Sequence, residues 1–114
     1  MAERIPLVVN VERIDRTIVL SPSGEISYHE APLFRTFIRQ AFDAKPAGIV
    51  VDMALVPYMS TPGVATLVEA LQMSRRNGGS LVICGLTEKV SEILRISKLD
   101  KVFKIVASRA VALA

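Results

Sequence analysis

The fold of this chain is decided by the stretch from Ile49 to Leu71, which reads IVVDMALVPYMSTPGVATLVEAL. The apolar run over residues 49–51 at its start predicts a strand that is buried on both faces. The second half of the stretch carries apolar side chains at helical spacing, at Val64, Leu67, Val68 and Leu71. That spacing predicts an amphipathic helix. A strand followed directly by a helix indicates one unit of an α/β fold.

The joint between this strand and this helix holds two hydroxyl residues, Ser60 and Thr61, followed by Pro62 and Gly63. Thr61 is predicted to be the N-cap, because its side-chain oxygen can accept from the free N–H groups of the first turn. Pro62 then falls at the first helical position, where proline is favoured. Gly63 has no side chain, so we expect it to leave the helix start open to close approach. The joint is therefore the expected functional surface.

The rest of the sequence predicts strands that alternate with helices after an opening hairpin. Strands are expected over residues 7–11 and 17–20, and the sequence SPSG at residues 21–24 predicts a loop. The later elements are expected in this order: a helix from about residue 30 to 42, a strand over 48–52, a helix to about Asn77, a strand over 80–84, a helix capped by Thr87, a strand over 104–107 and a terminal helix capped by Ser108. This order predicts a single α/β domain over residues 1–114, with a mixed, mostly parallel central sheet, an N-terminal β-hairpin and about four helices.

Composition excludes several classes of function. The chain has 114 residues and a net charge of +3, but its basic residues are scattered and form no stripe typical of a nucleic-acid site. No apolar run is long enough to cross a bilayer, and the first ten residues, MAERIPLVVN, lack the pattern of a signal peptide. The single cysteine, Cys84, cannot form an internal disulfide, which fits a reducing compartment. We therefore expect a cytoplasmic protein with no membrane insertion and no direct nucleic-acid partner.

Residue types that carry catalysis are scarce. His29 is the only histidine and falls in an expected loop, while Cys84 ends an apolar run and is expected to be a small core residue. The sequence has no phosphate-binding glycine motif, no metal-ligand spacing and no recognisable Ser–His–Asp set. Asp52 ends the central strand without the acidic pair that a two-component receiver carries, so we expect it to cap N–H groups of the following loop. No enzyme activity, cofactor or metal is expected.

The two hydroxyl residues allow two interpretations. One of them is expected to cap the helix, as Ser and Thr commonly do. The other interpretation is phosphorylation, which adds roughly −1.5 to −2 charge. At a helix start, the dipole and the free N–H groups tolerate that charge, so the fold would survive while the surface changed sign. Residue chemistry alone leaves both interpretations open.

Several segments resemble, in order and spacing, a STAS domain, the fold of bacterial anti-anti-sigma factors, over about residues 7–107. The segment YMSTPGV, from Tyr58 to Val64, is similar to the family's F-M-D-S-S-G-L. The other similar segments are Leu20–Ile26 (LSPSGEI), Ala31–Arg35, Val50–Met53, Arg75–Leu81 and Leu94–Phe103.

The resemblance implies a regulatory binding module whose partner is an anti-sigma factor that is also an ATP-binding serine/threonine kinase. The family's phosphoacceptor, the first serine of D-S-S-G, falls on Thr61 by position, with Ser60 as second choice. Phosphorylation would release the partner, so the protein would act in transcription by partner switching. Two residues depart from the motif: Ser60 stands in place of the aspartate, and Pro62 in place of a serine or small residue. Both would alter kinase docking.

The residues expected to contact the partner are Tyr58, Met59, Ser60, Thr61, Pro62, Gly63 and Val64. Exposed side chains at Tyr58, Met59 and Val64 would form an apolar patch, and the alternative for each is burial against the sheet. A competing function is a STAS subunit of an ABC-type lipid transport complex that does not switch, because some of those subunits also have threonine at the acceptor position. A sulfate-transporter tail is a third possibility, but this chain shows no membrane part.

Overall fold

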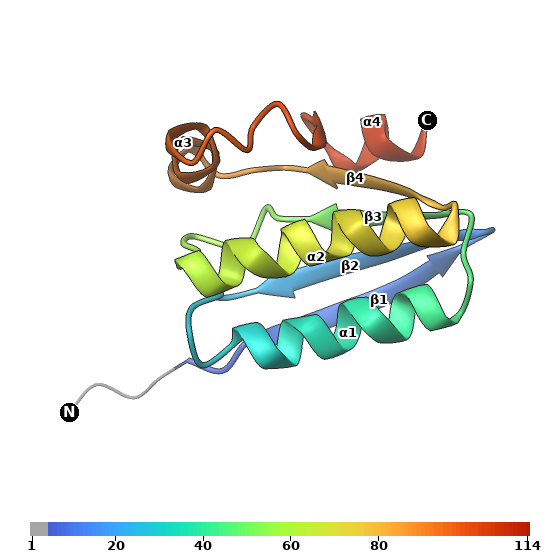
Figure 1. Cartoon of the computed structure of the whole chain (residues 1–114), viewed down its shortest axis with the longest axis horizontal. Coiled ribbons are helices and arrows are strands. Elements are labelled where there is room, and N and C mark those ends of the chain that lie inside the picture. Colours follow the sequence, from blue (N-terminus) through green and yellow to red (C-terminus); the bar gives the residue numbers. More distant parts are fainter. Residues whose placement is uncertain (1–4) are drawn as a thin grey trace.

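The computed structural model of the chain describes residues 5–114, and these residues form five strands and four helices. The strands lie in one sheet in the order of the sequence, from β1 to β5 (Figure 1). The strands are β1 (Val8–Ile14), β2 (Thr17–Ser23), β3 (Gly48–Asp52), β4 (Ser80–Cys84) and β5 (Lys104–Val106). The helices are α1 (Ala31–Asp43), α2 (Thr61–Asn77), α3 (Glu88–Ile96) and α4 (Arg109–Leu113).

The sheet is mixed, as predicted. β1 and β2 form an antiparallel hairpin with Ile14 opposite Thr17, and β2, β3, β4 and β5 pair in parallel. The parallel pairs follow from the helix that connects each strand to the next, because a crossover helix returns the chain to the same edge. β3 is therefore the central strand, and its first four residues are buried.

The helices divide between the two faces of the sheet. The larger core joins the sheet to α1, α2 and α3 through residues such as Phe34, Leu67 and Leu94, all fully buried. The smaller core lies on the other face, where Ala112 and Leu113 of α4 pack against the second cluster, made of Val19, Val50, Val82 and Cys84. An ion pair from Arg35 to Glu69, at 2.6 Å, connects α1 to α2.

The sequence SPSG at residues 21–24 forms less of a loop than its composition predicts. β2 continues through Pro22 to Ser23, so the prediction of a loop from Ser21 was wrong. The strand tolerates Pro22 because the pairing of β2 with β3 ends two residues earlier, at Leu20 and Val51. No backbone N–H is therefore needed from Pro22 to bond β3.

Within residues 5–114, no helix is both long and apolar enough to cross a membrane. The expectation that the chain lacks a signal peptide rests partly on residues 1–4, which lie outside the described residues.

Candidate functional site

The joint between β3 and α2 is a loop held by backbone hydrogen bonds on both sides. The N–H of Met53 donates to the carbonyl of Cys84 at 2.9 Å. On the other side, the segment after β2 pairs with the loop: Gly24 donates to Leu55 and Ile26 donates to Tyr58, both at 3.0 Å. These hydrogen bonds fix the position at which α2 begins relative to the sheet, and so they position the side chains of the loop.

Ser60, and not Thr61, is the N-cap of α2. The Ser60 hydroxyl oxygen accepts from the N–H of Gly63 at 3.3 Å, and its backbone is extended, with φ −84° and ψ 175°. The prediction of a Thr61 cap was one residue too late, so Pro62 occupies the second helical position and not the first. Both residues are favourable caps, and the backbone pairing of the loop decides between them.

The Thr61 side chain is exposed at the first position of α2. In the part of the chain that the structure describes, its hydroxyl forms no hydrogen bond. Ser60, by contrast, is half-buried and its oxygen is engaged in the cap. The two hydroxyls therefore have different roles in the structure: that of Ser60 caps the helix, and that of Thr61 is free.

Gly63 is buried and faces the protein, so the expectation that it keeps the helix start open was wrong. A Cβ atom at this position would lie 2.2 Å from the carbonyl oxygen of Ile26. The glycine is thus required for α2 to pack against the segment after β2. Met59 and Val64 are also buried, with exposed fractions of 1% and 7%, which contradicts the expected exposed patch at these two positions.

An open groove lies beside Thr61, between the start of α2 and the end of α3. Its volume is about 430 Å³ and its walls are mostly apolar. The residues that line it are Tyr58, Met59, Thr61, Val64, Ala65, Val68, Ile93, Ser97 and Leu99. Met59 and Val64 therefore form its floor, while Tyr58 and Thr61 stand at the surface. The Lys89 ammonium, on the first turn of α3, lies 5.7 Å from the centroid of the Tyr58 ring.

Asp52 caps the loop after β3, as predicted, by accepting from the N–H of Ala54 at 3.1 Å. Its other oxygen accepts from Arg109 of α4, also at 3.1 Å. Arg109 reaches two further strands, at 2.8 Å to Glu12 and 2.5 Å to Ser21. The sequence gives no sign of this cluster, because Arg109 lies 57 to 97 residues from its partners.

Cys84 is fully buried at the end of β4, in agreement with the predicted core role. Burial is the main cause that raises the pKa of its thiol to about 11; the charge of Asp52 raises it further and that of Arg109 opposes the rise. A thiol in this state is a poor nucleophile at neutral pH. His29 is exposed in the turn before α1 and contacts Tyr28 edge-on. Across residues 5–114, no three His, Cys, Asp or Glu side chains come together as a metal site.

Comparisons with known proteins agree on one family. The model of the STAS domain matches residues 8–112. The anti-sigma-B factor antagonist of Bacillus subtilis is 26% identical over 99 residues, which cover 87% of this chain and 90% of that protein.

Solved structures share the fold. An anti-sigma factor antagonist from Mycobacterium paratuberculosis superposes with a TM-score of 0.87 at 23% identity, over 97% of this chain and 96% of that one. SpoIIAA, an anti-sigma factor antagonist, has been solved in its unphosphorylated form, with a TM-score of 0.79 at 18% identity over 93% of each chain. The Bacillus cell fate determinant SpoIIAA has also been solved phosphorylated, with a TM-score of 0.72. With the sheet order, the hairpin and the match over nearly the whole length, the chain belongs to the STAS domain family.

Proposed function

We propose that this protein is a non-enzymatic anti-sigma factor antagonist that binds an anti-sigma factor with serine/threonine kinase activity and is released when Thr61 is phosphorylated. The observation that carries the proposal is the free, exposed hydroxyl of Thr61 beside the capping hydroxyl of Ser60. The names of its relatives, which include an anti-sigma-B factor antagonist and SpoIIAA, supply the class of partner. The phosphorylated form of SpoIIAA supports a switch of this kind.

Phosphorylation would be a simple group transfer from ATP. The Thr61 oxygen forms a bond to the γ-phosphorus, the bond from that phosphorus to the ADP oxygen breaks, and the hydroxyl proton passes to a base on the kinase. The kinase can reach Thr61 without opening α2, because that hydroxyl caps nothing. Modification of Ser60 would remove a cap that is worth about 1 kcal/mol.

The partner surface follows from the same geometry. Tyr58, Ser60, Thr61 and Pro62 are at least partly exposed around the helix start. A phosphate would add roughly −1.5 to −2 charge at this surface while the helix dipole tolerates it. The bound partner would then face a charge that the unmodified surface lacks.

The test is to immobilise the protein and capture partners from a lysate of its source, with and without ATP, while mass spectrometry maps the phosphate. We expect a kinase-type ATPase that leaves as Thr61 gains phosphate. Thr61→Ala should abolish incorporation, and Thr61→Glu should weaken binding at least about tenfold with unchanged far-UV circular dichroism.

Ser60→Ala is the matched control. It should lose about 1 kcal/mol of stability through the missing cap and still accept phosphate. If Ser60→Ala, and not Thr61→Ala, stopped incorporation, the acceptor would be Ser60. Equal binding of Thr61→Glu and wild type would refute the switch. Capture of ABC-transporter subunits with Thr61 unmodified would make the protein a subunit of a transport complex.

A further inference from the structure

The start of α3 is fastened to the loop that leads to Thr61. The Thr87 hydroxyl donates to the carbonyl of Val56 at 3.1 Å, and the same oxygen caps α3 by accepting from the N–H of Val90 at 3.3 Å. Two residues farther along each segment, Lys89 lies over the ring of Tyr58. The backbone of the first turn of α3 is therefore held beside the loop, and this fixes where the side chains of that turn begin.

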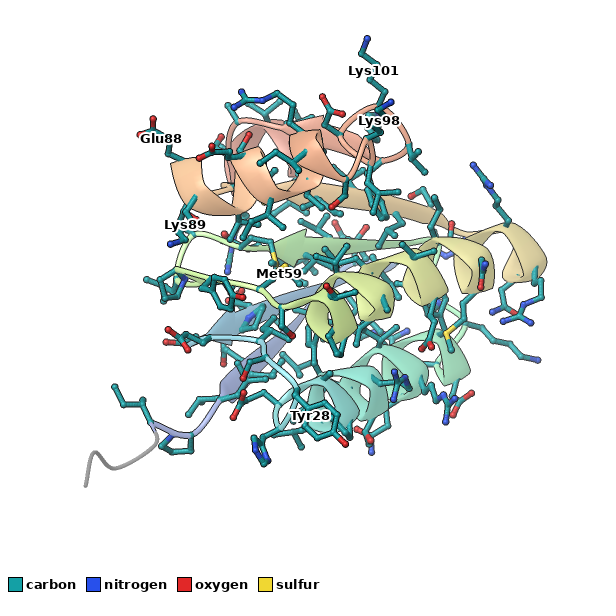
Figure 2. The ribbon with its side chains drawn as sticks, turned by 60° about the vertical axis from the view of Figure 1, so that its left-hand side comes forward. Tyr28, Met59, Glu88, Lys89, Lys98 and Lys101 are labelled. Atoms are coloured by element: carbon teal, nitrogen blue, oxygen red, sulfur yellow. The ribbon has the colours of Figure 1, made fainter. Side chains whose placement is uncertain are left out.

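Lys89 carries a charge that its own helix does not favour. It lies in the first turn of α3, where the dipole disfavours a cation and favours the neighbouring Glu88. No carboxylate among residues 5–114 forms an ion pair with Lys89. Figure 2 shows Lys89 pointing toward the loop before α2, whereas Glu88 points away from it. The Lys89 ammonium is therefore available to bind an anion on the loop before α2.

A phosphate on Thr61 would find few backbone donors. Helices usually offer several free N–H groups at their start. Here Pro62 has none, the N–H of Gly63 is taken by Ser60, and the N–H of Ser60 donates to Ile26 at 3.0 Å. Only the N–H of Thr61 itself remains among residues 60–63. Most of the counter-charge must therefore come from a side chain.

We propose that Lys89 binds the phosphate on Thr61, an inference that rests on the proposed function and extends it. Tyr58 and Thr61 line the same groove, and the Lys89 ammonium already lies over the Tyr58 ring. An ammonium held by the phosphate would connect the start of α3 to the start of α2 at the Tyr58 end of that groove. Phosphorylation would then fix Lys89 beside the groove as well as add charge, so the surface offered to the partner would change in both shape and charge.

The experiment measures the second ionisation of the phosphate by ³¹P NMR. Phosphothreonine is placed at position 61 during synthesis of the full chain with an expanded genetic code, so no kinase is needed. The Lys89 ammonium favours the doubly charged phosphate. Lys89→Gln should therefore raise the pH midpoint of the second phosphate ionisation by roughly 0.3 pH unit, and Lys89→Arg should return that midpoint to the wild-type value. Lys101→Gln removes the same charge from the turn after α3, where Lys101 points away from the loop before α2 (Figure 2), and should leave this pH midpoint unchanged.

Equal shifts in Lys89→Gln and Lys101→Gln, or none in either, would overturn the proposal, because the phosphate would then sense only net charge. Failure of the proposed function and failure of this inference give different results. If ATP and lysate never modify Thr61, the switch fails; if the encoded phosphate ignores Lys89, only this inference fails.

Discussion

At the residue scale, the absence of a side chain at Gly63 lets the start of α2, which carries the candidate site, pack against the backbone of Ile26. A Cβ atom here would approach the carbonyl oxygen of Ile26 to 2.2 Å and its carbon to 3.1 Å. That same oxygen accepts from the N–H of Ser60, so α2 cannot retreat without losing this bond and the cap beside it.

We therefore expect Gly63→Ala to lower the free energy of unfolding by about 1–3 kcal/mol, the usual cost of an overpacked site. Urea titration followed by circular dichroism measures the loss. Thr61→Ala, two residues away and exposed, is the control and should stay within about 0.5 kcal/mol of wild type. A Gly63→Ala protein as stable as the control would show that α2 can shift freely against residue 26.

At the scale of elements, α4 depends on Arg109. The helix has five residues, too few to be stable alone, and it covers the second cluster only through Ala112 and Leu113. Arg109 fastens it to three strands through Asp52, Glu12 and Ser21. Of the two carboxylates, Asp52 is the more buried, with 17% of its side chain exposed.

Arg109→Gln should leave the Asp52 carboxylate unpaired and let α4 open about 5- to 30-fold more often, which corresponds to one or two kcal/mol. Cys84 under α4 reports the opening, because Ellman's reagent reaches its thiol only when the second cluster is uncovered. Arg95→Gln, on the exposed side of α3, is the control. The prediction fails if Cys84 is labelled at the same rate in Arg109→Gln and Arg95→Gln, and if both rates rise with denaturant as steeply as global unfolding does. The thiol would then be reached only when the whole protein unfolds, and α4 would not open separately.

The elements themselves follow from local sequence. α2 ends at Asn77, followed by Gly78 in the left-handed region with φ 77°, and Thr87 and Ser108 cap α3 and α4; the helix end and both caps are as predicted. These signals lie within four residues of the feature they determine. The choice between Ser60 and Thr61 depends on how residues 24–26 pair with the loop, and the burial of Met59 and Val64 depends on the packing of the larger core, so both required the assembled fold.

At the scale of the whole molecule, the mixed and mostly parallel sheet was predictable because each parallel pair is joined by one helix and the first pair by a tight turn. The Arg109 cluster was not, because a surface arginine near the end of a chain carries no local signal of distant carboxylates. The same holds for Lys89, whose sequence neighbours give no indication of Tyr58. Sequence patterns predict which segments form helices and strands. The positions of the Arg109 and Lys89 charges depend on side-chain contacts between segments that are distant in the sequence.

The buried thiol makes global stability depend on alkaline pH. Burial, and then the charge of Asp52, raise the pKa of Cys84 from 9.0 to about 11 in the folded protein. In the unfolded chain the thiol loses its proton near pH 9, so between pH 9 and 11 the unfolded state binds fewer protons than the folded state. Stability should therefore be unaffected well below pH 9 and fall by up to about 1.4 kcal/mol per pH unit between these values.

Urea unfolding of wild type and Cys84→Ala at several pH values from 7 to 10.5 measures this dependence. The variant has a lower baseline because it leaves a small cavity, so only the two slopes are compared. We expect the wild type to lose stability more steeply above pH 9, because both proteins share every other titrating group. Parallel curves would mean that the thiol ionises as easily in the folded protein as in the unfolded chain. In that case α4 would not seal the second cluster against water, and the same result would weaken the expected effect of Arg109→Gln.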